Sequence, residues 1–199
     1  MIILSGGTGT PKLIRGFMDI VSEEKISVVV NTAEDIFVSG TLVTPDIDTV
    51  LYLLSGLLDE KKWWGVSNDT FKTYEMLKSL GIYETLPLSE IDRAVCIART
   101  DLINSGKTLT ETTEIIADKL KIKSSVFPMT DSPVQTIITT KDDEVMHFQK
   151  FWIQNGGKPE VKSVDIEFSK NVHISEELKS EFERNESVII GPSNPISSI

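Results

Sequence analysis

The sequence predicts an α/β protein, with a Rossmann-like parallel sheet, an inserted helical lobe and a β-hairpin excursion. The first observation is an apolar strand at residues 2–5 that runs into a glycine-rich turn and a helix, the order of a βα unit. The second is a continuous apolar run at residues 26–30, which is typical of a buried parallel strand. The third is a short apolar strand at residues 187–190, followed by another polar loop. We expect ligands to gather at the carboxyl ends of these strands.

The helices are predicted from apolar periodicity and from residues that start or stop a helix. Helical patterns fit residues 11–22, a segment that begins near Pro45 with Thr44 as its cap, and residues 70–80, 89–104 and 110–121. The last four of these helices follow the second strand, and no further strand is expected among them. We therefore expect a helical insertion over about residues 44–121. Asn68 and Asp69 are available to cap the helix at 70–80, and Gly81 should end it.

The pattern changes after the helices. Residues 134–140 and 144–153 alternate apolar and polar side chains on either side of a polar turn, which predicts a β-hairpin. Residues 154–170 are expected to form a loop and a short strand. Residues 175–184 are expected to form a helix capped by Ser175.

Length and composition bound the class of protein. The 199 residues suffice for one domain, so we expect residues 1–199 to form a single Rossmann-like domain. A net charge of −10 argues against nucleic acid or an anionic membrane as the main partner. The single cysteine excludes a disulfide within the chain, and no apolar run is as long as a membrane span. We therefore expect a cytoplasmic protein.

The turn after the first strand is the most informative stretch for function. It consists of Gly6, Gly7, Thr8, Gly9 and Thr10. Glycine has no Cβ, so its backbone N–H can approach an anion closely. Pro11 suits the first turn of the following helix, whose N-terminus adds the positive end of a helix dipole. The turn therefore predicts a phosphate site, although a plain tight turn would also use glycine.

Two common phosphate-binding classes are disfavoured. The turn has neither the G-x-G-x-x-G nor the G-x-x-x-x-G-K-[ST] spacing. A dinucleotide site usually carries an acid at the end of the second strand, and Asn31 stands there, with Glu34 and Asp35 further on. A nicotinamide dinucleotide and a P-loop ATPase are therefore not expected.

Asp46 and Asp48 stand at the start of an apolar helix. In this place carboxylates cap the helix and interact favourably with its positive end. They are also hard oxygen ligands of the kind that Mg²⁺ prefers, or a general base beside a phosphate. From the residues alone, both interpretations stay open.

The loop at residues 191–195 follows the last strand and holds two prolines. Its Ser193 and Asn194 offer groups that hold a phosphate or a nucleobase edge, but a rigid structural loop is equally compatible with them. We expect structural roles for the remaining residues that can carry chemistry or stack on a ligand, namely Trp63, Trp64, Cys96, His147 and His173.

Nine stretches spread over the chain are informative when they are taken as a set. They are residues 1–12, 28–35, 38–40, 45–52, 63–65, 68–71, 127–131, 146–149 and 191–195. Together they resemble the 2-phospho-L-lactate transferase family (CofD), over essentially the whole chain. The resemblance implies a Rossmann-like core with an inserted helical lobe. It also implies transfer of a phospholactyl or phosphoenolpyruvyl unit from a guanosine diphospho donor to the deazaflavin Fo. GMP is released, with Mg²⁺ as cofactor, in the coenzyme F-420 biosynthesis of archaea and actinobacteria.

The resemblance also implies residue roles. The donor phosphate and guanosine would contact Gly6, Gly7, Thr8, Gly9, Thr10, Ser193 and Asn194. Catalysis and Mg²⁺ binding would fall to Asp48 and Asp46. The acceptor Fo would lie near Asp48, Asn31 and Pro87.

This chain departs from the family pattern at residues 87–96. The family carries Leu-Gly-Asp-x-Asp-x-Ala-Thr-His after a basic residue. Here Pro87 replaces the basic residue, Ser89-Glu90 replaces Gly-Asp, and Val95-Cys96 replaces Thr-His. Two rival functions therefore stay open: a nucleotide-sugar-binding regulator of the related glycine-rich family, or an inactive or divergent paralogue that has lost Fo transfer.

The chain is shorter than members of that family, and only nine residues follow the strand at 187–190. A parallel strand that is apolar on both faces needs cover from neighbouring elements. We therefore expect this strand and the final loop to be partly exposed unless another chain covers them. This predicts either a homo-oligomer or a fragment of a longer enzyme that lacks the C-terminal part of the family.

Overall fold

A parallel sheet of four strands forms the centre of the computed structural model, which describes residues 1–168 and 171–199. In sheet order, the strands are β5 (Ser125–Pro128), β2 (Ser27–Val30), β1 (Ile2–Ser5) and β9 (Val188–Ile190). Ile3 pairs with Val28 on one side of β1 and with Ile189 on the other, both in parallel register. The predicted α/β class with a parallel sheet is confirmed. Sequence reasoning missed β5 as a strand.

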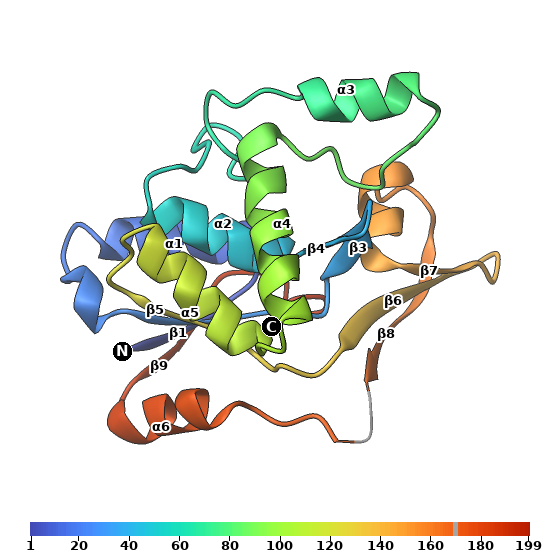
Figure 1. Cartoon of the computed structure of the whole chain (residues 1–199). Helices are drawn as coiled ribbons and strands as arrows, with labels where there is room; N and C mark the ends of the chain where they lie inside the picture. Colours follow the sequence, from blue (N-terminus) through green and yellow to red (C-terminus); the bar gives the residue numbers. More distant parts are fainter. Residues whose placement is uncertain (169–170) are drawn as a thin grey trace.

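Helices cover both faces of this sheet. Their bounds are α1 (Gly9–Phe17), α2 (Pro45–Leu54), α3 (Lys72–Ser79), α4 (Glu90–Asn104), α5 (Leu109–Lys119) and α6 (Glu176–Arg184). Figure 1 shows α1, α2 and α5 on one side of the strands and α6 on the opposite side. The first helix is shorter than expected, because it ends at Phe17 and a short 3-10 turn at Glu23–Lys25 precedes β2.

The alternation of side chains along the strands explains the two layers. On one face Ile3, Val28 and Val126 pack in the main core with the helices that follow β1 and β2. On the other face Ile2 and Val29 pack with Leu178 of α6. Because each strand sends successive side chains to opposite faces, a strand that is apolar throughout can bury both.

The elements α2 to α5 lie between β2 and β5 in the chain, as the expected insertion at about 44–121 requires. A small antiparallel pair, β3 (Ile36–Val38) and β4 (Thr41–Val43), precedes them and was not predicted. Its turn places Ser39 and Gly40 at positive φ. α4 packs against β4 and α5. The β3–β4 pair therefore links the helical insertion to the end of β2.

A separate antiparallel sheet accounts for the predicted hairpin. It has the order β7-β6-β8, with β6 at Val134–Thr140, β7 at Val145–His147 and β8 at Val161–Phe168. The hairpin is confirmed, but the expected strand over 144–153 is wrong in its second half, where Lys150–Gln154 form a π-helical turn. The segment at 154–170, expected to be a loop and a short strand, contains β8, whose eight residues make it longer than expected. The end of that prediction, residues 169–170, lies outside the described residues.

The predicted helix ends are partly confirmed. Ser175 Oγ accepts from the Leu178 N–H at 3.2 Å, and Gly81 ends α3 with φ of +82°. The Thr44 side chain makes no capping hydrogen bond. Asp69 contributes to another helix than expected, because its Oδ2 accepts from the Ile91 N–H in the first turn of α4 at 2.7 Å.

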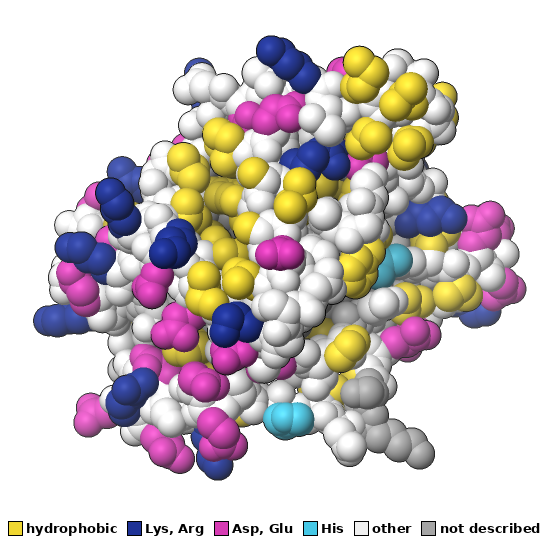
Figure 2. Space-filling view, viewed as in Figure 1, with side chains coloured by type: hydrophobic (Ala, Val, Ile, Leu, Met, Phe, Trp, Pro, Cys, Tyr) yellow, Lys and Arg dark blue, Asp and Glu magenta, His cyan; other side chains and the backbone are white. Residues whose placement is uncertain are grey.

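α3 lies apart from the core. None of its residues is buried, and apolar side chains gather on the surface around it (Figure 2), with Met76 and Leu80 exposed. Glu90 at the start of α4 accepts hydrogen bonds from the backbone N–H and the hydroxyl of Thr73, at 2.8 and 2.7 Å. These bonds tie α3 to α4.

β9 pairs with β1 alone among the described residues. Its side chains are more exposed than those of a central strand: Val188 is 49% exposed and Ile190 is 70% exposed. This agrees with the expected partial exposure of the strand. No helix in the described part of the chain is long and apolar enough to cross a membrane.

Candidate functional site

A cleft of about 820 Å³ opens where the strands β1, β2 and β9 end. Its lining includes Thr8 from the turn after β1, Glu34 from the segment after β2, and Ser193 from the loop after β9. The predicted site residues that line it are Gly7, Thr8, Asp46, Asp48, Pro87, Ser193 and Asn194. The carboxyl edge of the sheet thus brings together segments that are far apart in the sequence, as expected for this fold class.

The glycine turn and the final loop are hydrogen bonded to each other. The Gly6 N–H donates to Ser193 Oγ at 3.0 Å, and the Thr10 N–H donates to the same oxygen at 3.3 Å. Thr10 Oγ1 lies 2.7 Å from it. A hydroxyl oxygen therefore accepts from backbone N–H groups at the start of α1, where an anion would be favoured.

The glycines of the turn are also required by the packing of the chain itself. A Cβ on Gly7 would come within 2.2 Å of Asp46 Oδ1, and a Cβ on Gly9 would come within 1.9 Å of the Pro192 carbonyl oxygen. Sequence reasoning attributed both glycines to the approach of a phosphate. The structure adds a second reason, because the bare backbone lets α2 and the final loop close on the turn.

Asp46 is buried at the first turn of α2 and lines the cleft. Asn31 holds it from the end of β2, because Asn31 Nδ2 donates to Asp46 Oδ2 at 3.0 Å. Burial raises the pKa of Asp46 to about 7, and the Asn31 hydrogen bond opposes this shift. Asn31 itself does not line the cleft. Its expected contact with the acceptor stays a prediction.

Glu34 is a second buried carboxylate of the cleft, and sequence reasoning did not assign it to the site. Ser198 Oγ donates to Glu34 Oε1 at 3.0 Å. Burial, together with the nearby charge of Asp46, raises the pKa of Glu34 to about 8. Two carboxylates that crowd one cleft in this way favour the binding of a proton or a cation.

Asp48 lies two residues after Asp46 in α2 and is paired with Arg99 of α4. Both side chains are buried, and the Arg99 Nη1 and Nη2 groups donate to Asp48 Oδ2 and Oδ1 respectively. Burial raises the pKa of Asp48, and the Arg99 charge opposes that rise. Sequence reasoning missed Arg99. Its spacing from Asp92 and Cys96 on one helix face is the signal that could have found it.

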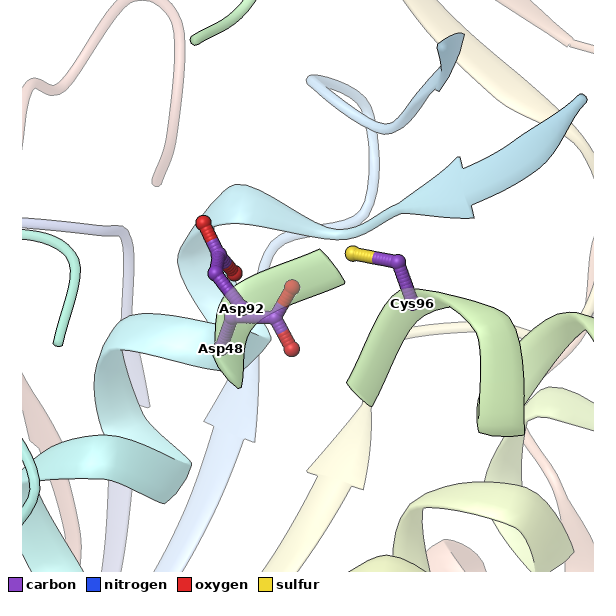
Figure 3. A group of neighbouring side chains, drawn as sticks. All are labelled: Asp48, Asp92 and Cys96. Carbon is purple, nitrogen blue, oxygen red and sulfur yellow. The ribbon is translucent and has the colours of Figure 1, made fainter. Parts of the chain in front are cut away.

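Asp48, Asp92 and Cys96 form a compact group between α2 and α4 (Figure 3), each offering one ligand atom within 4.8 Å of the others. Tyr52 donates its hydroxyl proton to Asp92 Oδ1 at 2.7 Å, and burial raises the pKa of Asp92 to about 6. Burial also raises the pKa of the Cys96 thiol, so it stays protonated at neutral pH. With Asp48 already paired to a guanidinium and sulfur a poor ligand for Mg²⁺, this group is a buried polar cluster.

A second set of lining residues, called here the aromatic end of the cleft, is apolar and aromatic. Phe148 and Trp152 stack with ring centroids 6.2 Å apart and planes 7° from parallel. Trp152 and Trp64 line the cleft while 57% and 47% exposed. Pro87 also lines the cleft, with its sequence neighbours Leu86 and Leu88. We expected Trp64 to be a structural plug, but it contributes to the wall of the cleft.

The two histidines do not join the cleft. His147 is half-buried, and its Nδ1 accepts from the Gln149 N–H at 3.1 Å. His173 is exposed beside α6. Cys96 is wholly buried and packs with Val38, Val43 and Leu88, as a core residue does.

The fold and the cleft define a class of protein: a Rossmann-like α/β protein with a ligand cleft at the carboxyl edge of its sheet, lined by acidic and polar side chains and by aromatic ones. The chain belongs to the 2-phospho-L-lactate transferase CofD family, whose model matches residues 1–199.

Two archaeal relatives show how close the similarity is. The chain is 52% identical over 199 residues to a 2-phospho-L-lactate transferase of Methanosarcina mazei, covering 100% of this chain and 65% of that protein. It is 42% identical over 200 residues to a protein of the same name from Methanocaldococcus jannaschii, covering 99% of this chain and 64% of that protein. The chain thus spans about 65% of the length of these relatives.

A solved structure supports the fold alone. A UPF0052-family protein of Bacillus halodurans superposes with a TM-score of 0.62 at 17% identity, covering all of this chain and 60% of that one.

Proposed function

We propose that this protein is a transferase of coenzyme F-420 biosynthesis. In this proposal it moves a phospholactyl or phosphoenolpyruvyl unit from a guanosine diphospho donor to the deazaflavin Fo and releases GMP. The observation that carries the proposal is the continuity of the cleft, which runs from the glycine turn and the acids to the aromatic wall. One cleft with these two ends suits a charged donor and a flat apolar acceptor.

The polar end suits the donor. The backbone N–H groups of Gly6 and Thr10 converge on one oxygen at the N-terminus of α1, as they would on a phosphate oxygen. Ser193, which supplies that oxygen, belongs to the loop assigned to the guanosine side. When the guanosine diphospho donor binds, these N–H groups exchange the Ser193 hydroxyl oxygen for a charged phosphate oxygen, which is a stronger hydrogen-bond acceptor.

The charge of the cleft supports a role for Mg²⁺. The described residues that line it include the acids Glu34, Asp46, Asp48 and Asp92 and no lysine or arginine. A diphosphate can enter such a cleft only with cations that balance the negative charge. Asp46 and Glu34 are the residues that fit Mg²⁺, because each presents hard carboxylate oxygens to the cleft beside the glycine turn. The ion would neutralise charge on the phosphates.

Of the two predicted metal ligands, Asp48 fits a different role. Arg99 donates hydrogen bonds to both of its oxygens, and Asp48 also lines the cleft. We assign to Asp48 the role of binding and orienting the terminal hydroxyl group of Fo. The hydroxyl oxygen forms a new bond to the phosphorus of the phospholactyl or phosphoenolpyruvyl unit, the bond from that phosphorus to the GMP oxygen breaks, and the hydroxyl proton passes to the Asp48 carboxylate.

The aromatic end suits the ring system of Fo. Trp152, which stacks on Phe148, lines the cleft, and Trp64 adds a second aromatic ring to the lining. A planar heterocycle gains both apolar burial and stacking in such a site. Pro87 contributes apolar contact here, where the family pattern has a basic residue.

Calorimetry with GDP, a UDP-sugar and Fo, each with and without Mg²⁺, tests this proposal. We expect GDP to bind more tightly with Mg²⁺, Fo to bind in the same cleft, and the UDP-sugar to bind weakly. Preference for the UDP-sugar would favour a nucleotide-sugar-binding regulator. GDP binding without any Fo binding would favour a paralogue that has lost transfer.

A further inference from the structure

Arg99 is the least exposed charged residue that the structure describes, at 0%. It lies in the middle of α4, where a guanidinium is tolerated only when it is paired and hydrogen bonded. The reaction proposed above uses Asp48 and gives no role to its partner.

The contacts of Arg99 fix Asp48 to a rigid part of the fold. The guanidinium donates to both oxygens of Asp48, and its Nη1 also donates to the Leu42 carbonyl oxygen of β4 at 3.3 Å. The next residue, Thr100, accepts from the Leu42 N–H at 2.8 Å. Arg99 is thus anchored to β4, and the carboxylate of Asp48 is anchored to Arg99. A bidentate pair of this kind fixes the plane of the carboxylate as well as its position.

Arg99 does not line the cleft, whereas Asp48 does. Each carboxylate oxygen can accept more than one hydrogen bond, so Asp48 can accept from Arg99 on one side and from a hydroxyl group in the cleft on the other. We propose that Arg99 is a positioning residue, which holds the Asp48 carboxylate in the orientation that receives the acceptor's hydroxyl group. This inference rests on the proposed function, because the hydroxyl is that of the acceptor.

A purely structural ion pair is the competing explanation, and α4 offers a matched comparison. Arg93, on the same helix, donates to both carboxylate oxygens of Glu84 at 2.9 and 2.6 Å. The two side chains are 11% and 1% exposed, and neither lines the cleft. Replacing Arg93 therefore reports what the loss of a forked pair on α4 does to the fold alone.

The experiment compares Arg99→Lys with Arg93→Lys in the purified protein. Lysine keeps the charge but cannot span both carboxylate oxygens. Measured are the melting temperature, the Kd for GDP, and kcat and KM for transfer to Fo. We expect Arg99→Lys to lower kcat by about 10-fold to 100-fold through misplacement of Asp48, with the GDP affinity unchanged. Arg93→Lys should lower the melting temperature comparably and leave kcat unchanged.

A wild-type kcat in folded Arg99→Lys would overturn the inference, and so would a loss of kcat that is equal in the two variants. If the wild-type protein transfers nothing, the proposed function fails separately. A crystal structure of Arg99→Lys then decides, because an unchanged Asp48 carboxylate overturns the inference and a rotated one supports it. If Arg99→Lys does not fold, a crystal structure of the wild-type protein with bound Fo tests the inference instead. A ribityl hydroxyl bonded to Asp48 supports the inference, and one placed elsewhere contradicts it.

Discussion

The glycines of the first turn show how one residue type can serve both packing and binding. Gly7 leaves room for Asp46 Oδ1, and Gly9 leaves room for the Pro192 carbonyl oxygen. The glycine pattern was readable from the sequence. The close approach of α2 and the final loop was not, because it depends on contacts between residues far apart in the chain.

Gly7→Val places a branched side chain where Asp46 now lies. We expect Asp46 to be displaced from the cleft and GDP affinity to fall by at least tenfold, about 1.4 kcal/mol. Calorimetry with GDP and Mg²⁺ measures this effect. Gly16→Ala is the control, because a Cβ there meets nothing within 4 Å. It lies in the last turn of α1, so the substitution should raise stability slightly and leave GDP binding unchanged. Equal GDP affinity in both variants would rule out the polar end as the donor site.

Asp48→Asn removes the charge that pairs with buried Arg99. We expect a loss of about 3 kcal/mol in unfolding free energy, since breaking one partner leaves the other charge buried, and a fall in transfer of at least about 100-fold. Denaturant unfolding and a transfer assay measure the two effects. If Asp48 only capped its helix, this variant would spare stability, because Asn caps helices as well as Asp does. A variant as stable as the wild type would contradict the observed ion pair, and full activity would reduce Asp48 to a structural residue.

The elements that carry the aromatic wall come from the antiparallel sheet and its π-helical turn. The hairpin was predictable, since its alternation of apolar and polar side chains is regular. The turn at Lys150–Gln154 was not, because Phe151 and Trp152 also fit a strand, and tertiary packing overrides that local preference. The strands β3 and β4 were missed for another reason: each has only three residues, too few to show a period.

Trp152→Ala removes the exposed ring from the wall formed by the turn. Because the loss falls at the aromatic end, we expect KM for Fo to rise about 5-fold to 10-fold, in line with a stacking contribution of about 1 kcal/mol, while GDP affinity stays the same. Steady-state kinetics against Fo, with GDP calorimetry in parallel, separates the two ends. Trp63→Ala is a useful comparison, because Trp63 packs against the main core and does not line the cleft. A weaker GDP affinity with unchanged KM for Fo would reverse the assignment of the ends.

At the scale of the whole molecule, the acids of the cleft should make stability depend on pH. The pKa values of Asp46 and Glu34 are about 7 and 8 in the folded state, above the ordinary values of 3.8 and 4.5. At pH values between the ordinary and the raised pKa values, the folded protein binds more protons than the unfolded chain. The unfolding free energy therefore falls as pH rises. The slope is about 1.4 kcal/mol per pH unit for each extra proton. The lowered pKa of His147 acts in the opposite direction, but it is a single group.

Denaturant unfolding from pH 5 to pH 9 checks this expectation. We expect stability to decrease between about pH 5 and about pH 8, and Glu34→Gln should make the slope less steep. Added Mg²⁺ should offset the decrease above pH 7, where the carboxylates are ionised. Stability that rises steadily over this range would contradict the raised pKa values and the crowding of acids on which the Mg²⁺ proposal depends.

The central claim is that one cleft joins a guanosine diphospho donor to a deazaflavin acceptor. The most direct test is a transfer assay with the purified protein, the donor and Fo, followed by chromatography of the deazaflavin. We predict a more anionic deazaflavin product, formed together with an equal amount of GMP, only when Mg²⁺ is present. Binding of both substrates without any new deazaflavin product under these conditions would contradict the claim.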